Sequence, residues 1–198
     1  IKITDATNGP VAIKAASTAA AATDQSLVVA LSPNSHVKAT VSPLFTGSAN
    51  TLTATLASLA TGSARSSAAV NNTSNLYEDV LIFVTITPPT TCVSGTGYVN
   101  VFGYGSLDGT NFPESGVGTD AAATISSPAN LPLLAQITVN ANSGTRASFK
   151  YGPFSFCRTF GLDRLPPYWG VVVQNNCGAA LAASGQSITY LPVNGQLV

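Results

Sequence analysis

Apolar side chains recur at every second position along most of this chain, and this alternation restricts its fold more than any other feature. In residues 75–89, NLYEDVLIFVTITPP, it places Val80, Ile82, Val84 and Ile86 on one face of an extended segment. Alternation over roughly four to eight residues, with β-branched and aromatic side chains dominating, is typical of a half-buried β-strand. The segment is therefore predicted to be a strand with one face in a core.

The same period of two returns in short segments that are separated by Gly, Pro, Asn and Ser. The predicted strands are residues 26–33, 37–45, 50–59, 75–89, 96–105, 131–142, 145–156, 168–175 and 186–193. One of them carries three aromatic side chains on one face, Tyr98, Phe102 and Tyr104. Many short strands with turn residues between them are typical of a β-sandwich or a β-barrel, so we expect an all-β protein.

The first residues differ from the rest of the chain. Residues 1–26 are predicted to form an extended N-terminal arm with two short strands, and residues 27–198 a single β-sandwich domain. The alanine-rich stretch 17–26 has helical propensity, but a helix this short is marginal without tertiary packing. We therefore favour an extended arm over a helix. Residues 119–130 pose the same choice, and we interpret them as a long loop.

The chain has few charged side chains, which narrows the classes of partner. Eight basic and eight acidic residues cancel, and charged residues make up 8% of the sequence. The usual share is roughly 25%. Binding to a nucleic-acid backbone depends on clustered cations, so nucleic acid is not an expected partner. No apolar run reaches about 18 residues, so a membrane is not expected either. A surface of Ser, Thr, Asn and Gly suits a permanent assembly or a secreted β protein.

The sequence offers no obvious catalytic or metal-binding set. The single histidine, His36, lies in a predicted turn without a nucleophile-elbow motif. One histidine and no CxxC pair leave a zinc site without ligands. Cys92, Cys157 and Cys177 are expected to be reduced and buried, with one disulfide plus one free thiol as the alternative. We expect no catalytic residue, no metal, no cofactor and no enzymatic activity.

A polar segment after the aromatic strand contains a turn signal. Ser106, Asp108, Gly109 and Phe112 resemble the Asp-box hairpin of sialidase-type β proteins, although the spacing is one residue short. In that motif the residues brace a turn, and Asp-Gly is by itself a strong turn signal. The resemblance therefore implies a structural role for these residues.

The acidic residues suggest two other kinds of site, a calcium site and a pair of catalytic carboxylates, and neither fits the sequence well. Calcium takes roughly six to eight oxygen ligands, and this segment has four candidates, but their spacing fits no known calcium loop. They are Asp108, Asn111, Glu114 and Asp120. We favour an ordinary polar loop. Glu78 and Asp79 are adjacent in a predicted strand and face opposite ways, which does not suit paired-carboxylate catalysis. We interpret them as a guard of an edge strand against aggregation.

One charged and aromatic segment, residues 157–170, is the candidate interaction site. Its candidate interface residues are Arg158, Asp163, Arg164, Tyr168 and Trp169. Arg, Tyr and Trp most often anchor protein interfaces, so the segment is predicted to dock on a partner protein. The alternative is an Arg–Asp pair that closes a loop over the core, with Trp169 simply buried, because interface and core aromatics look alike in sequence.

Three stretches resemble a group of small structural proteins of tailed bacteriophages, usually encoded among head and portal components. They are residues 9–35 (GPVAIKAASTAAAATDQSLVVALSPNS), 50–86 (NTLTATLASLATGSARSSAAVNNTSNLYEDVLIFVTI) and 165–181 (LPPYWGVVVQNNCGAAL). The resemblance covers nearly the whole chain and rests on overall texture, without a catalytic signature. It implies a virion component, with decoration (cementing) of the head as the favoured role. Proteins in that role commonly form jelly-roll or related sandwiches, sit as trimers on the capsid and grip neighbouring capsomers with extended termini.

We therefore expect a jelly-roll-like β-sandwich with an extended N-terminal arm that binds and stabilises the phage capsid shell. The expected partners are the major capsid protein and further copies in a homotrimer. The expected location is the capsid surface of a virion assembled in the host cytoplasm. One alternative is a tail, connector or fibre-attachment component. Another is a carbohydrate-binding sandwich with a stacking platform of Tyr98, Phe102, Tyr104 and Trp169.

Overall fold

A computed structural model of the chain describes residues 4–5, 9–10, 41–45, 47–89, 91–92, 97–114, 116–126, 130–139 and 148–197. The chain forms two units, Ile1–Lys38 and Ala39–Val198, and each is described by itself. In the first unit, β1 (Thr4–Asp5) pairs antiparallel with β2 (Gly9–Pro10). The predicted strand 26–33, the alanine-rich stretch 17–26 and His36 lie outside the described residues.

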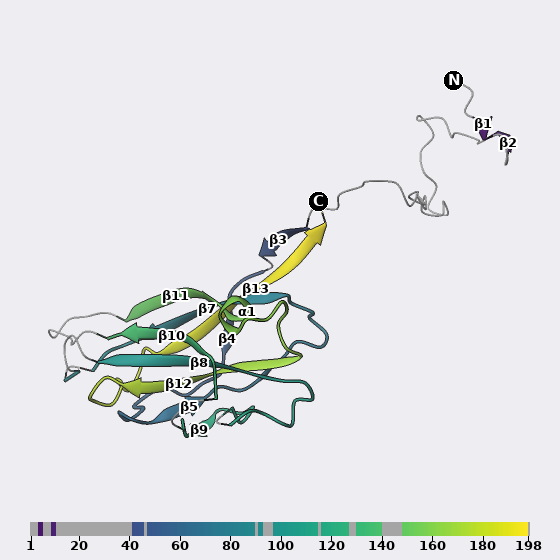
Figure 1. The fold of residues 1–198 in the computed structure, drawn as a ribbon. Helices are drawn as coiled ribbons and strands as arrows, with labels where there is room; N and C mark the ends of the chain where they lie inside the picture. The colour runs from purple at the N-terminus through teal and green to yellow at the C-terminus, as the bar shows by residue number, and fades with distance from the viewer. Residues whose placement is uncertain are drawn as a thin grey trace. The chain divides into compact units, whose positions relative to one another are not determined.

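The second unit is built from two antiparallel sheets (Figure 1). Its elements are β3 (Val41–Phe45), β4 (Asn50–Leu52), β5 (Ala64–Ser66), β6 (Val70–Asn71), β7 (Asp79–Ile86), β8 (Tyr98–Ser106), β9 (Ala121–Ala123), β10 (Leu133–Thr138), β11 (Phe149–Ser155), α1 (Phe156–Phe160), β12 (Tyr168–Asn176) and β13 (Ser187–Leu197). One sheet has the order β10-β8-β12-β5-β9, with β6 also beside β12. The other has the order β11-β7-β13-β3, with β4 also beside β13.

This strand order is that of a jelly roll. We count β3 and β4 as the first strand and β5 and β6 as the second, and we set β9 aside as an added edge strand. Renumbered in chain order, the two sheets then read 6-3-8-1 and 5-4-7-2. Strand 1 thus lies beside 8, 2 beside 7, 3 beside 6 and 4 beside 5, which is the strand pairing of a jelly roll. The expectation of an all-β, jelly-roll-like sandwich is confirmed.

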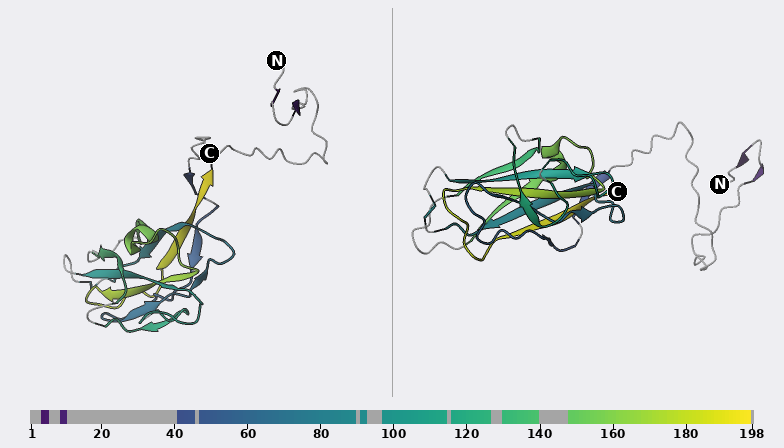
Figure 2. Two further views of the ribbon diagram at one scale, coloured as in Figure 1. Left: turned by 45° about the vertical axis from the view of Figure 1, so that its right-hand side comes forward. Right: turned by 90° about the horizontal axis from the view of Figure 1, so that it is seen from below.

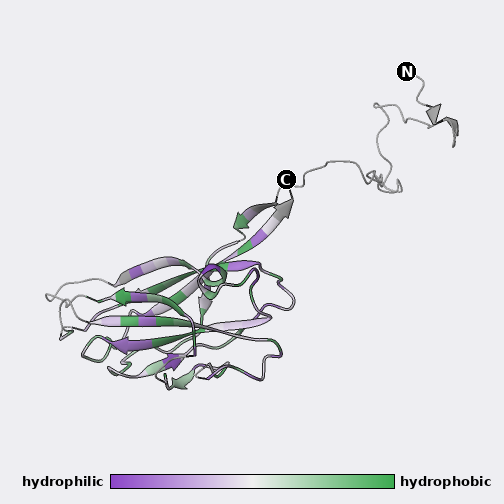
Figure 3. Cartoon of the chain, viewed as in Figure 1, coloured by the Kyte–Doolittle hydropathy of each residue, from purple (hydrophilic) through white to green (hydrophobic). Residues whose placement is uncertain are grey.

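The main core lies between the two sheets. The four side chains that alternate along β7, Val80, Ile82, Val84 and Ile86, are all fully buried, as predicted. They belong to one cluster with inward side chains of the opposite sheet, among them Val101 of β8. Figure 3 shows the corresponding alternation of hydrophobic and hydrophilic bands along β8 and β10. Because the period is two, each strand buries one face and leaves the other free for a second role.

The outer face of β8 is buried as well. Phe102 and Tyr104 form a second cluster with Val172 of the neighbouring strand β12. The segment that follows β8 folds back over this cluster and brings Phe112 edge-on to Tyr104, with ring centroids 5.6 Å apart. The sheet therefore has a core on each side along part of its length. Figure 2 shows the same layers from two further directions.

Two expectations from the sequence need correction. Residues 119–130 were expected to be a loop, but they contain β9, which forms because its backbone pairs with β5 at the edge of the sheet. Glu78 and Asp79 do not guard an edge strand, because β7 lies between β11 and β13. Asp79 instead anchors the neighbouring helix α1, which the alternation did not predict.

The three cysteines, Cys92, Cys157 and Cys177, are free and buried, as expected. Burial, together with the neighbouring Cys177, raises the pKa of the Cys92 thiol to about 12. Burial, together with the charge of Asp79, raises the pKa of Cys157 above its usual range. Since the thiolate is the reactive form, these two cysteines are packing residues at neutral pH.

Candidate functional site

One end of the sandwich gathers most of its unusual surface features. It is formed by residues 71–78, 106–112 and 156–168, which meet because Tyr168 of β12 pairs with both Asn71 and Ser106. The pairing of β7 with β13 stops at Asp79 and Val193, and β13 continues past this end. Beyond that point its described residues pair only with β3, as a two-stranded ribbon of residues 41–45 and 193–197. We call this region the ribbon end (Figure 1).

A pocket of about 620 Å³ opens at the ribbon end. It lies between the two segments that the sequence singled out, the turn after β8 and the chain between α1 and β12. Its walls are Gly105, Ser106, Leu107, Asp108, Asn111, Phe160, Leu162, Arg164, Leu165, Pro166 and Pro167. Most of these side chains are apolar, so the pocket suits an apolar group far better than a charged one.

The first wall of the pocket is a turn held by short hydrogen bonds. The Asp108 carboxylate accepts from the backbone N–H groups of Asn111 and Thr110 at 2.8 and 2.9 Å. These bonds, led by the one from Asn111, lower the pKa of Asp108. Ser106 Oγ accepts from the N–H of Gly109 at 3.1 Å, and Gly109 has a φ of 72°, which favours glycine. The bracing role that the Asp-box resemblance implied for Ser106, Asp108 and Gly109 is confirmed.

The second wall is fixed to the sheet through α1. Ser155 caps the helix by accepting from the N–H of Arg158 at 3.1 Å, and the left-handed Gly161 ends it. Phe160, which lines the pocket, stacks on the buried Phe156 with centroids 4.9 Å apart. The Asp79 carboxylate accepts from the Cys157 N–H, so both walls are rigid.

Exposed apolar side chains are frequent at the ribbon end, and two of them, Leu107 and Leu162, line the pocket. Seven large hydrophobic side chains of the described residues are exposed, and five of them belong to the ribbon end. They are Leu44, Phe45, Leu76, Leu107 and Leu162. Leu107 is 85% exposed and Leu76 is 73% exposed, values that are unfavourable for a leucine in water. Exposed apolar side chains with polar neighbours are typical of interaction surfaces.

The loop that carries Leu76 is also rigid. The buried side chain of Asn72 accepts from the Tyr77 N–H at 2.9 Å and donates to the Tyr77 carbonyl at 3.0 Å. Leu76 itself has a φ of 52°, in the left-handed region that favours glycine. A leucine held in this conformation and exposed to solvent contributes little to the isolated fold. Its features therefore fit a role in contacts with another molecule.

The predicted interface residues are divided by the structure. Arg158, Asp163 and Arg164 are exposed, and Arg164 lies in the pocket wall. Among the described residues, no ion pair joins Asp163 to either arginine. Tyr168 is half-buried, and its ring lies against Gly109. Trp169 is fully buried between Phe156 and Tyr190, at centroid distances of 5.5 and 5.0 Å. Trp169 is thus a core residue, as the alternative interpretation had it.

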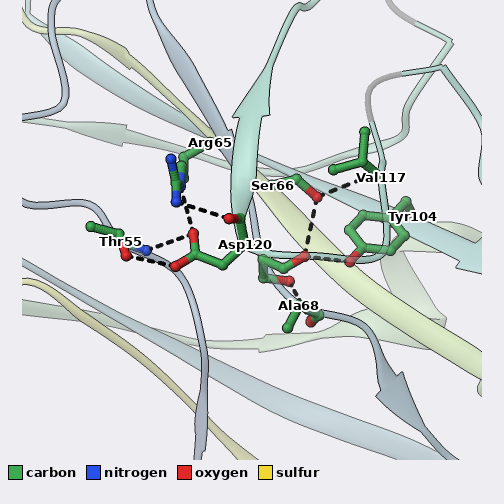
Figure 4. Close-up of polar contacts among 8 residues, drawn as sticks. Thr55, Arg65, Ser66, Ala68, Tyr104, Val117 and Asp120 are labelled. Carbon is green, nitrogen blue, oxygen red and sulfur yellow. Dashed lines mark hydrogen bonds and ion pairs between the residues drawn. The ribbon is translucent and has the colours of Figure 1, made fainter.

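The acidic candidates for calcium do not come together. Asp108 bonds within its own turn, and Glu114 accepts from the N–H groups of Ser126 and Asn130 at 3.2 and 2.7 Å. Asp120 accepts from Arg65 Nε at 2.5 Å and from Thr55 Oγ1 at 2.6 Å (Figure 4). No group of three metal-binding side chains is found among the residues that the structure describes.

Partial burial by itself would raise the pKa of Asp120, but hydrogen bonds from Arg65 and Thr55 and the charge of Arg65 outweigh it. They lower the pKa of this carboxyl to about 2. Arg65 lies in β5, Asp120 directly precedes β9 and Thr55 follows β4, so these contacts join three segments of the chain. The side chains of Arg65 and Asp120 are only 27% and 20% exposed. This is a structural ion pair at the sandwich edge.

The aromatic residues considered for a carbohydrate platform are not available on the surface. Tyr104 and Trp169 are fully buried and Phe102 is 6% exposed, while Tyr98 is half-buried. Tyr104 donates its hydroxyl to the Ser67 carbonyl at 2.7 Å under the segment that covers this face. These four side chains do not form a stacking platform.

The chain matches no protein-family model, no curated protein and no solved structure. In the described part of the chain, no helix is long and apolar enough to cross a membrane. The site must therefore be interpreted from its own geometry. Three of the exposed apolar residues of the ribbon end had a weak signal in the sequence. Leu76, Leu107 and Leu162 are each a single leucine in a polar or glycine-containing turn.

Proposed function

We propose that this protein is a structural component of a phage particle, most consistent with a decoration protein that binds and stabilises the capsid shell. The single observation that carries the proposal is the ribbon end, where a rigid apolar pocket and five exposed apolar side chains converge. A surface of this kind is unfavourable on a free monomer and favourable when neighbouring chains cover it.

The fold and the composition support the proposal. Jelly rolls are the architecture of many viral capsid domains, although also of lectins and cupins, so the fold alone does not decide function. The chain has only eight basic and eight acidic residues, and three of them, Arg158, Asp163 and Arg164, lie in the candidate interface segment. A charge-poor surface buries on a partner with a small desolvation cost. Nucleic acid is a poor fit because clustered cations are needed for it.

The described ionisable groups also fit a structural role. Asp79, Asp108, Glu114 and Asp120 each make hydrogen bonds that fix a turn, a helix or a sheet edge. Their hydrogen bonds are made within the domain, and the proposed structural role requires no catalytic chemistry from them. The resemblance of residues 9–35, 50–86 and 165–181 to tailed-phage structural proteins suggests the shell as the partner and a homotrimer as the assembly.

A particle-level experiment tests this function. Phage particles with and without the protein are compared for DNA retention under heat and under chelation, and the copy number per particle is counted. We expect particles without the protein to lose DNA at lower temperature, and hundreds of copies per particle. Equal retention would contradict the decoration role. Six or twelve copies would assign the protein to the tail or connector instead.

Matched leucine variants connect this test to the ribbon end. Leu76→Glu changes an exposed leucine of the ribbon end, and Leu133→Glu changes one that is 45% exposed on β10. We expect Leu76→Glu to weaken the affinity for particles about tenfold, the effect of losing about 1.4 kcal/mol of binding free energy. Leu133→Glu should bind like the unchanged protein. Equal losses in both variants would contradict docking through the ribbon end.

A further inference from the structure

We infer that the ribbon of one copy inserts into the pocket of a second copy, so that the protein assembles with itself head to tail. The knob is Phe45, at the base of the ribbon, and the hole is the pocket beside Leu107 and Leu162. The inference deepens the proposed function and rests on the homotrimer in it, because it names the contact that would hold the copies together.

The ribbon is the part of the fold that most needs a covering partner. Beyond Val193 its two strands pair only with each other among the described residues, and Figures 1 and 2 show them extending past the sandwich. A two-stranded ribbon without a hydrophobic support is marginally stable in water. Phe45 is 55% exposed and Leu44 is 39% exposed, so the ribbon presents apolar side chains without a core to receive them.

The pocket is an apolar hollow that an apolar side chain of a second copy would fill. Its volume of about 620 Å³ is bounded by two rigid walls, and Phe45 and Leu44 of the same chain do not line it. Leu107 and Leu162 stand at its exposed rim. An aromatic side chain that fills an apolar pocket at the centre of a contact is the usual anchor of a protein interface.

The ribbon and the pocket wall have few ionisable side chains. The ribbon sequences VSPLF (41–45) and VNGQL (193–197) contain no ionisable side chain. The pocket wall has two, Asp108 and Arg164. Asp108 already accepts hydrogen bonds from Thr110 and Asn111, and Arg164 is exposed in the single chain. The ribbon therefore brings no charge of its own into the pocket, and the contact requires only that Arg164 stay at its edge.

The place where the ribbon meets the rest of the chain favours the same occupant. β3 begins at Val41, which pairs with Leu197 at the outer tip of the ribbon, so the preceding chain joins the domain at that tip. When each copy seats its ribbon on a different neighbour, the contact is heterologous, and it closes into a ring such as a trimer where the rotation between copies permits.

Two complementary variants test the contact in solution, without phage particles. Phe45→Glu damages the knob and leaves the hole, and Leu107→Glu damages the hole and leaves the knob. Both side chains are exposed, so the fold should tolerate the changes, and circular dichroism with thermal unfolding checks this. Leu133→Glu is the matched control. Masses are measured by analytical ultracentrifugation and native mass spectrometry.

We expect the unchanged protein and Leu133→Glu to form a trimer, and each damaged variant to be a monomer, with self-association at least tenfold weaker. An equimolar mixture of Phe45→Glu and Leu107→Glu should form a heterodimer, because one intact knob meets one intact hole. A monomeric unchanged protein, a trimer that survives both changes, or a mixture that stays monomeric would overturn the inference. Trimers that persist while particle binding is lost would assign the pocket to the shell, which overturns the inference and leaves the proposed function standing.

Discussion

The carboxylate of Asp79, the first residue of β7, accepts a 2.8 Å hydrogen bond from the backbone N–H of Cys157 in α1. The same carboxylate accepts from Ser155 Oγ at 2.5 Å and from the N–H of Val80 at 2.8 Å. One side chain therefore fixes the start of a strand, the cap of a helix and, through that helix, the Phe160 wall of the pocket. The ribbon end depends on this anchor for its shape.

Asp79→Asn should lower the free energy of unfolding by about 1–3 kcal/mol, because an amide cannot accept all of these bonds and its N–H₂ group faces other donors. Chemical denaturation measures the change. Glu78→Gln is the control, since Glu78 is adjacent and its side chain is exposed. Equal stability of the two variants would contradict the anchoring role of Asp79.

The pair of Asp120 and Arg65 predicts a specific loss of stability in acid. The pKa of Asp120 is about 2 in the folded protein and has an ordinary value of 3.8. The folded state therefore binds this proton less tightly than the unfolded state does. The stabilisation is complete above about pH 4 and disappears as the pH falls toward 2.

Asp120→Asn should accordingly cost about 1–2 kcal/mol of stability near neutral pH, with the partial exposure of the pair reducing the effect. The difference in unfolding free energy between the two proteins should stay constant from pH 7 to 5 and shrink between about 4 and 2. Urea titrations at several pH values measure it. A difference that grows in acid would refute this assignment.

Gly170 lies where the outer aromatic cluster meets the sheet. A Cβ atom on this residue would overlap the Tyr104 ring and hydroxyl, which donates a hydrogen bond to the Ser67 carbonyl, and would lie 2.8 Å from Ser67 Oγ. Gly170→Ala should therefore cost about 3 kcal/mol or more through overpacking. Gln174→Ala, on the same face of β12, should cost less than about 1 kcal/mol. Thermal unfolding of both variants gives the comparison, and a fully stable Gly170→Ala protein would show that this face is loosely packed.

Leu76 predicts opposite effects on stability and on docking. Its φ of 52° is more favourable for glycine than for leucine. Leu76→Gly should keep or raise the free energy of unfolding, by up to about 1 kcal/mol, and at the same time weaken binding to particles. Denaturation and a particle-binding assay measure the two quantities. A variant that unfolds more easily and binds normally would mean that the leucine serves the fold.

The longer strands of the sandwich could be predicted from the sequence because each has its own signal, whereas the short β5 and β6 were not predicted. The alternation in residues 79–86 and the apolar run of β12 state which face is buried before any partner is known. β9 and α1 carry no such signal. Three alanines become a strand only because the β5 edge is beside them, and a five-residue helix forms where Asp79 holds its first turn.

The candidate site was harder to predict because the pairing of strands that are distant in the sequence brings its residues together. The sequence indicated the two segments that form the pocket walls, but only the pairing of Ser106 with Tyr168 brings them together. The sequence did not show that Trp169 is buried in the core while Arg164 lines the pocket. The single leucines Leu107 and Leu162 became informative once their exposure was known.

The central claim is that the ribbon end of this jelly roll is a surface buried by neighbouring chains in an assembled particle. Electron cryo-microscopy of the intact particle at side-chain resolution tests it most directly. The account predicts density for the domain on the shell, with Phe45, Leu107 and Leu162 covered by adjacent chains. A particle in which the domain is present and its ribbon end faces open solvent would contradict the account.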